Sequence, residues 1–180
     1  DLDNTQWTPK LGLRLNASDQ ATLYLQAVRG YRAPPFSDVN VGLYLPTFNY
    51  LVKPNPELKA ERSLGLEAGL RWSGPILHGS LAAYDNRFRD LIESRANLGI
   101  DPATGALVFQ SVNRDRARIR GIEADAHWSL GAWREAWRGT YVELRANWLR
   151  GTDTVRDQPL NSVAPARATV VGGWQADAQR

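Results

Sequence analysis

The sequence alternates between polar and apolar residues with a period of two over long stretches, which favours extended strands with two unlike faces. The segment Glu61 to Trp72 shows the pattern best, with charged Glu67 and Arg71 on one face and Leu64 on the other. The other segments with this pattern are 10–17, 21–29, 77–92, 119–128, 140–148 and 166–175. We therefore predict an all-β protein with about seven strands.

The predicted connections alternate between short and long. The short ones are 16–20, 73–76 and 129–139, and the long ones are 30–60, 93–113 and 151–165. Short turns on one side and long loops on the other are typical of outer-membrane β-barrels. Strands of ten or more residues also exceed the average of about 5–6 residues in soluble sheets.

Four tryptophans fall on the apolar face at the ends of predicted strands. Trp72, Trp128 and Trp174 lie near short turns, and Trp148 lies at a long-loop end. Amphipathic indole rings gather at membrane interfaces, so this placement favours a transmembrane antiparallel β-barrel. The alternative is a soluble β-sandwich binding module, in which the same rings would be core residues.

Composition excludes several other classes of function. The chain has no cysteine, which excludes disulfides and cysteine-based metal sites. Its net charge of +3 indicates no dedicated nucleic-acid surface. The apolar runs are far shorter than the ~20 residues that a transmembrane helix needs. No cluster of catalytic residues emerges, so neither an enzyme in general nor a membrane-embedded protease or lipase is favoured.

Seven strands leave a barrel open, and an open strand edge in hydrocarbon leaves backbone groups unpaired. We therefore expect residues 1–180 to be part of the barrel domain of a longer protein, with the remaining strands outside this chain.

Prolines mark both ends of the long connection 30–60. Pro34 and Pro35 cannot donate backbone hydrogen bonds, so we expect the preceding strand to end there. Pro54 and Pro56 end the connection, and Asn55 between them favours a turn. The aromatic residues between these ends are Phe36, Tyr44, Phe48 and Tyr50. Aromatic groups on a loop above a barrel mouth form a plausible ligand surface.

These proline-marked segments also carry a family resemblance. GYRAPPF at 30–36 and NPELKAE at 55–61 resemble the paired boxes of TonB-dependent haem and haemoglobin receptors. Further segments that fit this family are 90–94, 109–113, 117–123 and 159–165. The resemblance implies a bacterial outer-membrane importer whose barrel has about 22 strands, a size that holds a plug domain in its lumen. Ferric-siderophore and cobalamin receptors carry related boxes and remain alternatives.

The resemblance also implies a ligand and partners. Haem, free or carried by a haemoprotein or hemophore, would be the transported substrate, with no tightly bound cofactor, and the TonB complex would act through the plug. The predicted ligand-binding residues are Arg32, Phe36, Tyr44, Phe48, Tyr50 and Asn55. Because no histidine lies between the boxes, Tyr50 is the first candidate for the haem-iron ligand and Tyr44 the second. We interpret His78 and His127, at short-turn ends, as structural.

The alternation further predicts which way charged residues point. Glu67, Arg71, Glu123 and Arg145 are expected to face the lumen. The stretch from Arg114 to Arg118 extends above the expected apolar band of ~25 Å. We therefore predict that Arg118 and Arg120 contact phosphates of outer-leaflet lipopolysaccharide, where a guanidinium can bind two oxygens. Ordinary solvated arginines are the alternative.

Overall fold

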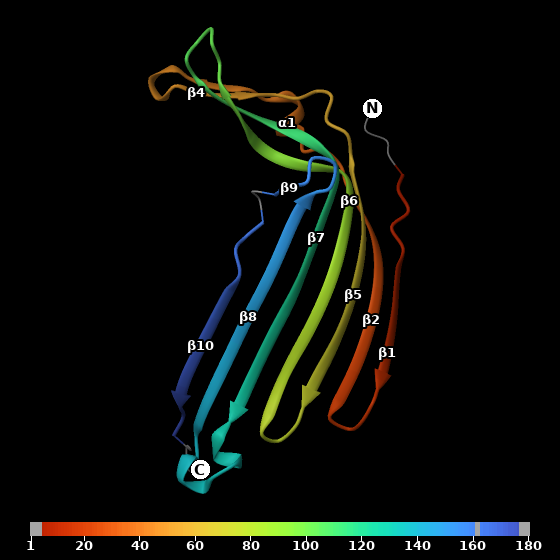
Figure 1. Cartoon of the computed structure of the whole chain (residues 1–180), viewed down its shortest axis with the longest axis vertical. Coiled ribbons are helices and arrows are strands. Elements are labelled where there is room, and N and C mark those ends of the chain that lie inside the picture. The colour runs from red at the N-terminus through yellow and green to blue at the C-terminus, as the bar shows by residue number, and fades with distance from the viewer. Residues whose placement is uncertain (1–4, 161–162, 177–180) are drawn as a thin grey trace.

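The computed structural model describes residues 5–160 and 163–176 and shows one tall, curved β-sheet that we call the wall (Figure 1). Its long strands are β1 (Lys10–Asn16), β2 (Ala21–Arg32), β5 (Glu61–Ser73), β6 (Leu77–Ile100), β7 (Leu107–Ser129), β8 (Thr140–Asp153) and β10 (Arg167–Trp174). They lie side by side in this order, and each pairs antiparallel with the next. The prediction of long antiparallel strands is therefore confirmed.

Short elements connect the long strands. Between β2 and β5 lie α1 (Phe36–Asn40), β3 (Leu43–Leu45), η1 (Pro46–Phe48) and β4 (Tyr50–Lys53). Between β7 and β8 lie η2 (Leu130–Ala132) and η3 (Glu135–Trp137), and β9 (Gln158–Pro159) follows β8. As expected from the two prolines, β2 ends at Arg32.

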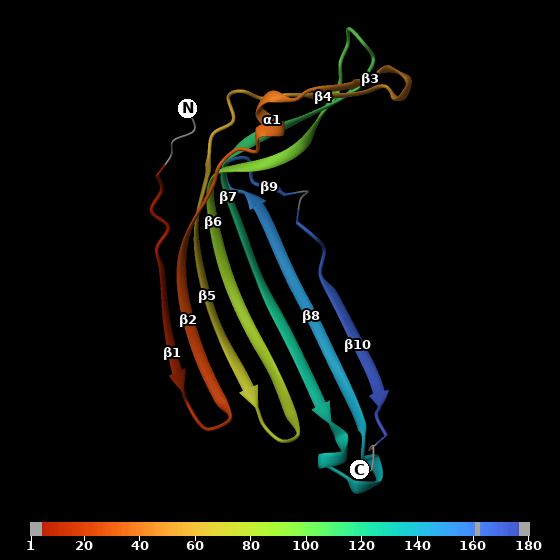
Figure 2. The same ribbon diagram turned by 180° about the vertical axis from the view of Figure 1, so that it is seen from behind.

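The wall is a single layer, and no second sheet covers either face in the described part of the chain (Figures 1 and 2). This excludes the β-sandwich alternative, which requires two packed sheets. Among the described residues, no helix is long and apolar enough to span a membrane.

The two faces of the wall have different chemistry, as the alternation predicts. Direct cross-strand partners share a face, so the pairs Leu25–Ala68 and Leu23–Leu70 belong to one apolar face. Large side chains on this face are open to the surroundings, with 45% of Leu66 and 47% of Ile122 exposed. By contrast, the buried apolar residues lie near or above the upper ends of the strands: Leu58, Ile92, Ala96, Ala106, Val108, Ala117 and Leu160. In the described part of the chain the wall thus has almost no core of its own, which suits a sheet with lipid against its apolar face.

Tyrosine rings cover cross-strand glycines on the opposite, charged face. Tyr24 pairs with Gly69, Tyr84 with Gly121, and Tyr141 with Gly173. A Cβ atom added to Gly69 would lie 2.4 Å from atoms of the Tyr24 ring. Glycine is therefore needed at this position so that the ring can lie flat across the neighbouring strand.

The prediction of a long loop over residues 93–113 is wrong. Strands β6 and β7 continue as a hairpin and pair from Leu77–Trp128 up to Ile100–Leu107. The hairpin contains two register shifts, between Glu93 and Ala96 and between Asn97 and Gly99. Such bulges bend strands without ending them, and the interrupted alternation conceals the strand in the sequence.

The tryptophans lie where the alternation puts them. Trp72 pairs with Ala21 and Trp128 pairs with Leu77, both at the short-turn ends of their strands. Trp148 pairs with Ile122, only six residues above Trp128 along β7, on the same apolar face. It therefore lies at mid-height of the wall and not at the long-loop end that the sequence predicted, because β8 continues for five residues beyond it.

Candidate functional site

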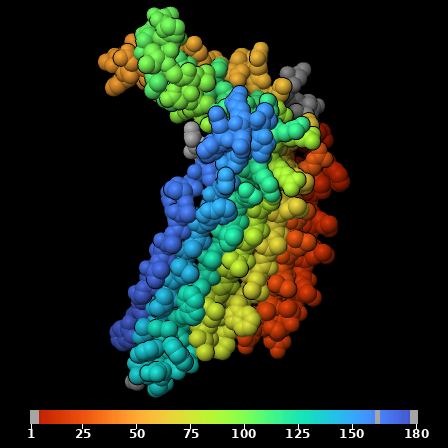
Figure 3. Space-filling model, viewed as in Figure 1, coloured from red at the N-terminus to blue at the C-terminus, as the bar shows by residue number. Residues whose placement is uncertain are grey.

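A platform projects sideways from the upper end of the wall (Figures 1 and 3). We define it as residues 33–60 together with 91–112, that is, α1, β3, η1, β4 and the upper parts of β6 and β7. It forms because β4 pairs in parallel with β7, from Tyr50–Leu107 to Lys53–Gln110. The connection between the two boxes is therefore an ordered extension of the sheet.

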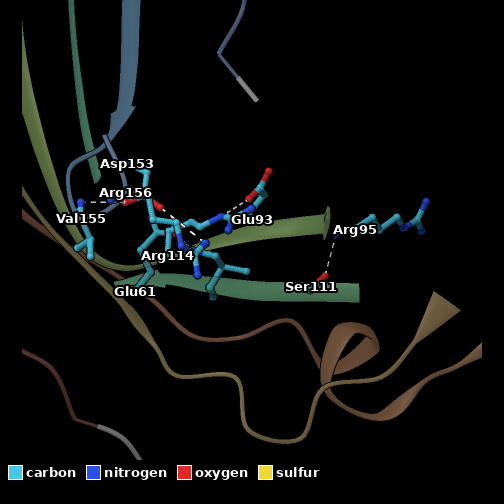
Figure 4. Close-up of polar contacts among 9 residues, drawn as sticks. Glu61, Glu93, Arg95, Ser111, Arg114, Asp153, Val155 and Arg156 are labelled. Atoms are coloured by element: carbon cyan, nitrogen blue, oxygen red, sulfur yellow. Dashed lines mark hydrogen bonds and ion pairs between the residues drawn. The ribbon is translucent and has the colours of Figure 1, made fainter. Parts of the chain in front are cut away.

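The strands bend where the wall meets the platform (Figure 4). Asp90 and Arg95 have positive φ values of 54° and 52°, which are uncommon for residues other than glycine. Polar contacts hold the bend: the carboxylate of Glu61 accepts the backbone N–H of Ile92 at 3.0 Å, and Arg114 forms an ion pair with Glu93.

Asn55, between the two prolines, ties the platform together. Its side-chain amide donates to the carbonyl oxygen of Ser111 at 2.9 Å, and its backbone N–H donates to the carbonyl oxygen of Asp38 at 2.8 Å. Its side-chain oxygen accepts the backbone N–H of Glu57 at 3.1 Å, which forms the expected turn. The Ser111 hydroxyl in turn donates to the Asp38 carboxylate at 2.8 Å.

Asn113 makes a second tie, at the base of the platform. Its side-chain oxygen accepts the backbone N–H of Lys59 at 2.8 Å, and its amide donates to the carbonyl oxygens of Lys59 and Asp90. The segments 55–61, 90–94 and 109–113, which carry the family resemblance, thus meet in one network. Their shared role in this structure is to fix the platform on the wall. Of the segment 159–165, Asn161 and Ser162 lie outside the described residues.

An ion pair joins β4 to the turn that follows β6. The Lys53 ammonium lies 3.2 Å from the Asp101 carboxylate, which also accepts the backbone N–H of Ala103 at 2.9 Å. The N–H of Ala103 and then the Lys53 ammonium lower the pKa of Asp101 below its usual value. Both contacts therefore favour the charged carboxylate at neutral pH.

The two candidate tyrosines lie on opposite faces of the platform sheet. Tyr50 pairs with Leu45, and because side chains alternate along a strand, Tyr44 points to the other face. The Tyr50 ring is partly covered by Phe109, with ring centroids 5.1 Å apart, whereas 47% of Tyr44 is exposed. The two tyrosines therefore offer two different surfaces to a ligand.

The other predicted ligand-binding residues differ in how accessible they are. Phe36 and Phe48 are 71% and 75% exposed on the platform. The Arg32 guanidinium lies 3.8 Å from the Glu61 carboxylate at the platform's base. Asn55 uses its amide and its side-chain oxygen in the platform ties. Direct ligand contact by these residues stays a prediction, and for Asn55 the geometry supports a positioning role.

The two histidines lie at the short-turn end, far from the platform. His78 and His127 are direct cross-strand partners with ring centroids 6.3 Å apart, and His127 stacks on Tyr141. Nδ1 of His127 lies 3.4 Å from the Glu143 carboxylate. Within residues 5–160 and 163–176, no group of three or more His, Cys, Asp or Glu side chains is arranged to hold a metal ion.

The four residues predicted to face the lumen share the charged face of the wall. Glu67, Glu123 and Arg145 line one groove of about 510 Å³ with Tyr24, whose hydroxyl donates to Glu67 at 2.8 Å. The Arg71 guanidinium lies over the Tyr24 ring, 5.3 Å from its centroid.

The predicted lipopolysaccharide contacts lie on the apolar face, above its band of large apolar side chains. Arg118 forms an ion pair with Asp85, and its Nε lies 3.0 and 3.1 Å from the two carboxylate oxygens. Arg120 is the direct cross-strand partner of Asp85. Beside them, Arg62 and Arg89 extend this basic surface from other strands. Sequence reasoning missed these two because strand register decides which arginines become neighbours.

Comparison with known proteins agrees with this architecture. Residues 1–179 match the family model described as TonB dependent receptor-like, beta-barrel. The chain belongs to the TonB-dependent receptor family. Members of this family are transporters of the bacterial outer membrane and not enzymes, so the predicted fold, location and lack of catalysis are confirmed.

Relatives within the family have several named ligands. The chain is 31% identical over 155 residues to the probable hemoglobin and hemoglobin-haptoglobin-binding protein 3 of Haemophilus influenzae, a match that covers 84% of this chain and 14% of that protein. It is 32% identical over 124 residues to the vitamin B12 transporter BtuB of Vibrio vulnificus, covering 69% of this chain and 18% of BtuB. The chain thus spans less than a fifth of the length of either relative.

A solved structure shows the same fold. The ferric enterobactin receptor PfeA of Pseudomonas aeruginosa superposes with a TM-score of 0.69 at 22% identity, covering 96% of this chain and 26% of the receptor. At this identity the likeness establishes the arrangement of strands and leaves the ligand open.

Proposed function

We propose that this TonB-dependent receptor imports haem, free or taken from a haemoprotein or hemophore, and that the chain supplies part of the barrel wall and an outer binding platform. The observation that carries the proposal is the platform itself. The haem-receptor-like boxes fix it to the wall, and it exposes Phe36, Tyr44 and Phe48. The similarity to relatives that are named as hemoglobin-binding or hemoglobin-utilization proteins also supports haem as the cargo.

A large, flat and mostly apolar macrocycle suits such a surface, because aromatic side chains bury much area against a planar partner. Tyrosine is also an established ligand of ferric haem iron. Tyr50 and Tyr44 are the candidates, one on each face of the platform sheet. We retain Tyr50 as the first candidate because it lies beside the second box, where Phe109 fixes its ring.

Transport would proceed as the resemblance to TonB-dependent receptors implies. Ligand captured on the platform would enter the barrel, and the TonB complex would act on the plug domain. Lipid and lipopolysaccharide of the outer membrane would surround the apolar face of the wall.

A ferric siderophore or cobalamin is the second candidate for the cargo. The similarity to BtuB favours cobalamin, and the related boxes of ferric-siderophore receptors support a siderophore. The sequence lacks a histidine between the two boxes, so haem import by this receptor depends on another ligand to the iron.

Growth on defined iron sources tests the proposal. A strain that carries the full parent receptor should grow with hemoglobin or haem as its sole iron source. Deletion of the receptor gene or of tonB should abolish this growth. Growth on haem that is unchanged by deletion of the receptor, together with lost growth on a ferric siderophore, would replace haem with the siderophore as cargo.

A further inference from the structure

Eight arginines from five strands gather on the apolar face of the wall, between the band of exposed leucine, isoleucine and tryptophan side chains and the platform. We call this patch the arginine surface. Its arginines are Arg29, Arg62, Arg87, Arg89, Arg116, Arg118, Arg120 and Arg150. Cross-strand pairing puts them on one face: Arg29 pairs with Leu64, Leu64 with Arg87, and Arg87 with Arg118.

Three of these arginines form a row across adjacent strands. Arg62 on β5 pairs directly with Arg89 on β6, and Arg89 pairs directly with Arg116 on β7. Like charges at directly opposed positions destabilise a sheet. None of these three guanidiniums forms an ion pair with a residue that the structure describes. The row therefore places three like charges side by side across three strands.

The local charge is far out of proportion to that of the chain. Asp85 is the acidic residue that lies among these arginines, and its carboxylate already forms ion pairs with Arg118 and Arg87. Eight arginines and one aspartate give the arginine surface a formal charge of +7, against +3 for the whole chain. Such a concentration of guanidinium groups attracts a ligand with several negative charges.

The height of the row matches the boundary of a bilayer. Trp128 marks the lower end of the apolar face on β7, and Arg116 lies twelve residues above it. This stretch measures ~40 Å along the strand, or ~30 Å in height at a tilt of ~40°. The hydrocarbon band of an outer-membrane barrel is ~25 Å tall, so Arg116 and its partners lie at the level of lipid headgroups.

The surface is also hollowed. A groove of about 760 Å³ lies among Arg29, Arg62, Arg87, Arg89, Arg116 and Arg118, with Leu64 in its lining. A planar guanidinium can bind two phosphate oxygens at once, and Leu64 offers an apolar contact below.

We propose that the arginine surface is a binding site for the phosphate groups of lipid A in outer-leaflet lipopolysaccharide. Lipid A carries its phosphates on a sugar disaccharide directly above its acyl chains. Its phosphates can reach several arginines of the row while its acyl chains lie on the apolar band. A phospholipid with one phosphate would neutralise a smaller part of the row. The inference rests on the outer-membrane orientation in the proposed function, but not on haem as cargo.

The test compares two variants of the full parent receptor that lose the same charge. One variant carries Arg62→Gln, Arg89→Gln and Arg116→Gln. The matched control carries Arg14→Gln, Arg134→Gln and Arg138→Gln, which change exposed arginines towards the short-turn end. Lipopolysaccharide retained through purification is measured as lipid A per receptor, after heat-modifiable migration has shown that both barrels are folded. We expect retention by the first variant to fall at least about tenfold, the loss that corresponds to one strong charged contact, and retention by the control to match the unmutated receptor.

Two further measurements identify the ligand. Receptor stripped of lipid should rebind lipid A in detergent and should bind enzymatically dephosphorylated lipid A at least about tenfold more weakly. Equal retention by both variants would overturn the site. Equal binding of lipid A and phosphatidylglycerol would overturn the assignment to lipopolysaccharide. Haem binding by the first variant should be unchanged, so failure of this inference is distinguishable from failure of the haem proposal.

Discussion

The side-chain amide of Asn55 donates a hydrogen bond at 2.9 Å to the carbonyl oxygen of Ser111, which joins segments 56 residues apart in the sequence. Together with the contact of the Asn55 backbone to Asp38, it fixes the small helix and β4 against β7. Asn55 belongs to the second box and was predicted to bind the ligand. In the structure it holds the platform together.

Asn55→Ala should loosen the platform without unfolding the wall. The change removes the donor to Ser111 and the acceptor for the Glu57 N–H, at a cost of about 1–3 kcal/mol. Limited proteolysis of the full receptor should then cut within residues 33–60 much faster, while heat-modifiable migration of the barrel persists. Asn40→Ala is the control, because its amide makes one local contact to the Phe36 carbonyl oxygen. Equal protease resistance of the two variants would contradict the role of Asn55.

Leu66→Lys should impair barrel assembly far more than Gln26→Lys. Leu66 is 45% exposed on the apolar face, where a charge near the middle of the membrane costs about 2–4 kcal/mol. Gln26 is the direct partner of Glu67 on the charged face, so a lysine there gains an opposite charge. The yield of folded receptor in outer-membrane fractions measures the difference. Similar yields for both variants would reverse the assignment of lipid and lumen faces.

Gly69→Val should disturb the charged face in a different way. The new side chain would displace the Tyr24 ring and its hydrogen bond to Glu67, with a cost of about 1–3 kcal/mol for overpacking. Gly172→Val is the matched control, because a Cβ there meets open space on the apolar face. Urea unfolding of both variants in detergent should show lower stability for the Gly69 variant alone. Equal stabilities would mean that the tyrosine does not depend on the glycine.

Much of the wall follows from the sequence, because a period of two decides which face each side chain takes. Pro34 and Pro35 likewise predict the end of β2. The platform could not be predicted, since the hairpin bends at Asp90 and its two register shifts, one of them at Arg95, break the alternation. The parallel pairing of Tyr50 with Leu107 links segments far apart in the chain, and local patterns carry no information on it. The sequence predicted only part of the arginine surface for the same reason. Arg118 and Arg120 belong to one strand, whereas Arg62 and Arg89 lie on other strands and become their neighbours only through strand pairing.

Tyr50→Phe should alter the absorption spectrum of the haem-loaded receptor. Loss of the phenolate oxygen would remove a tyrosinate-type high-spin signature if Tyr50 is the axial ligand. Tyr44→Phe should leave the spectrum unchanged, because Tyr44 lies on the opposite face of the platform sheet. The reverse result would assign the ligand to Tyr44. Unaltered spectra and affinities for both variants would contradict ligation by either tyrosine.

Direct titration of the purified full receptor with haem, hemoglobin and ferric enterobactin tests the central claim most directly. The account predicts saturable binding of haem or hemoglobin, weakened by Asn55→Ala but unaffected by Asn40→Ala, and no saturable binding of ferric enterobactin. Saturable binding of the ferric siderophore with no binding of haem or hemoglobin would contradict the haem assignment, and the family and the fold would stand.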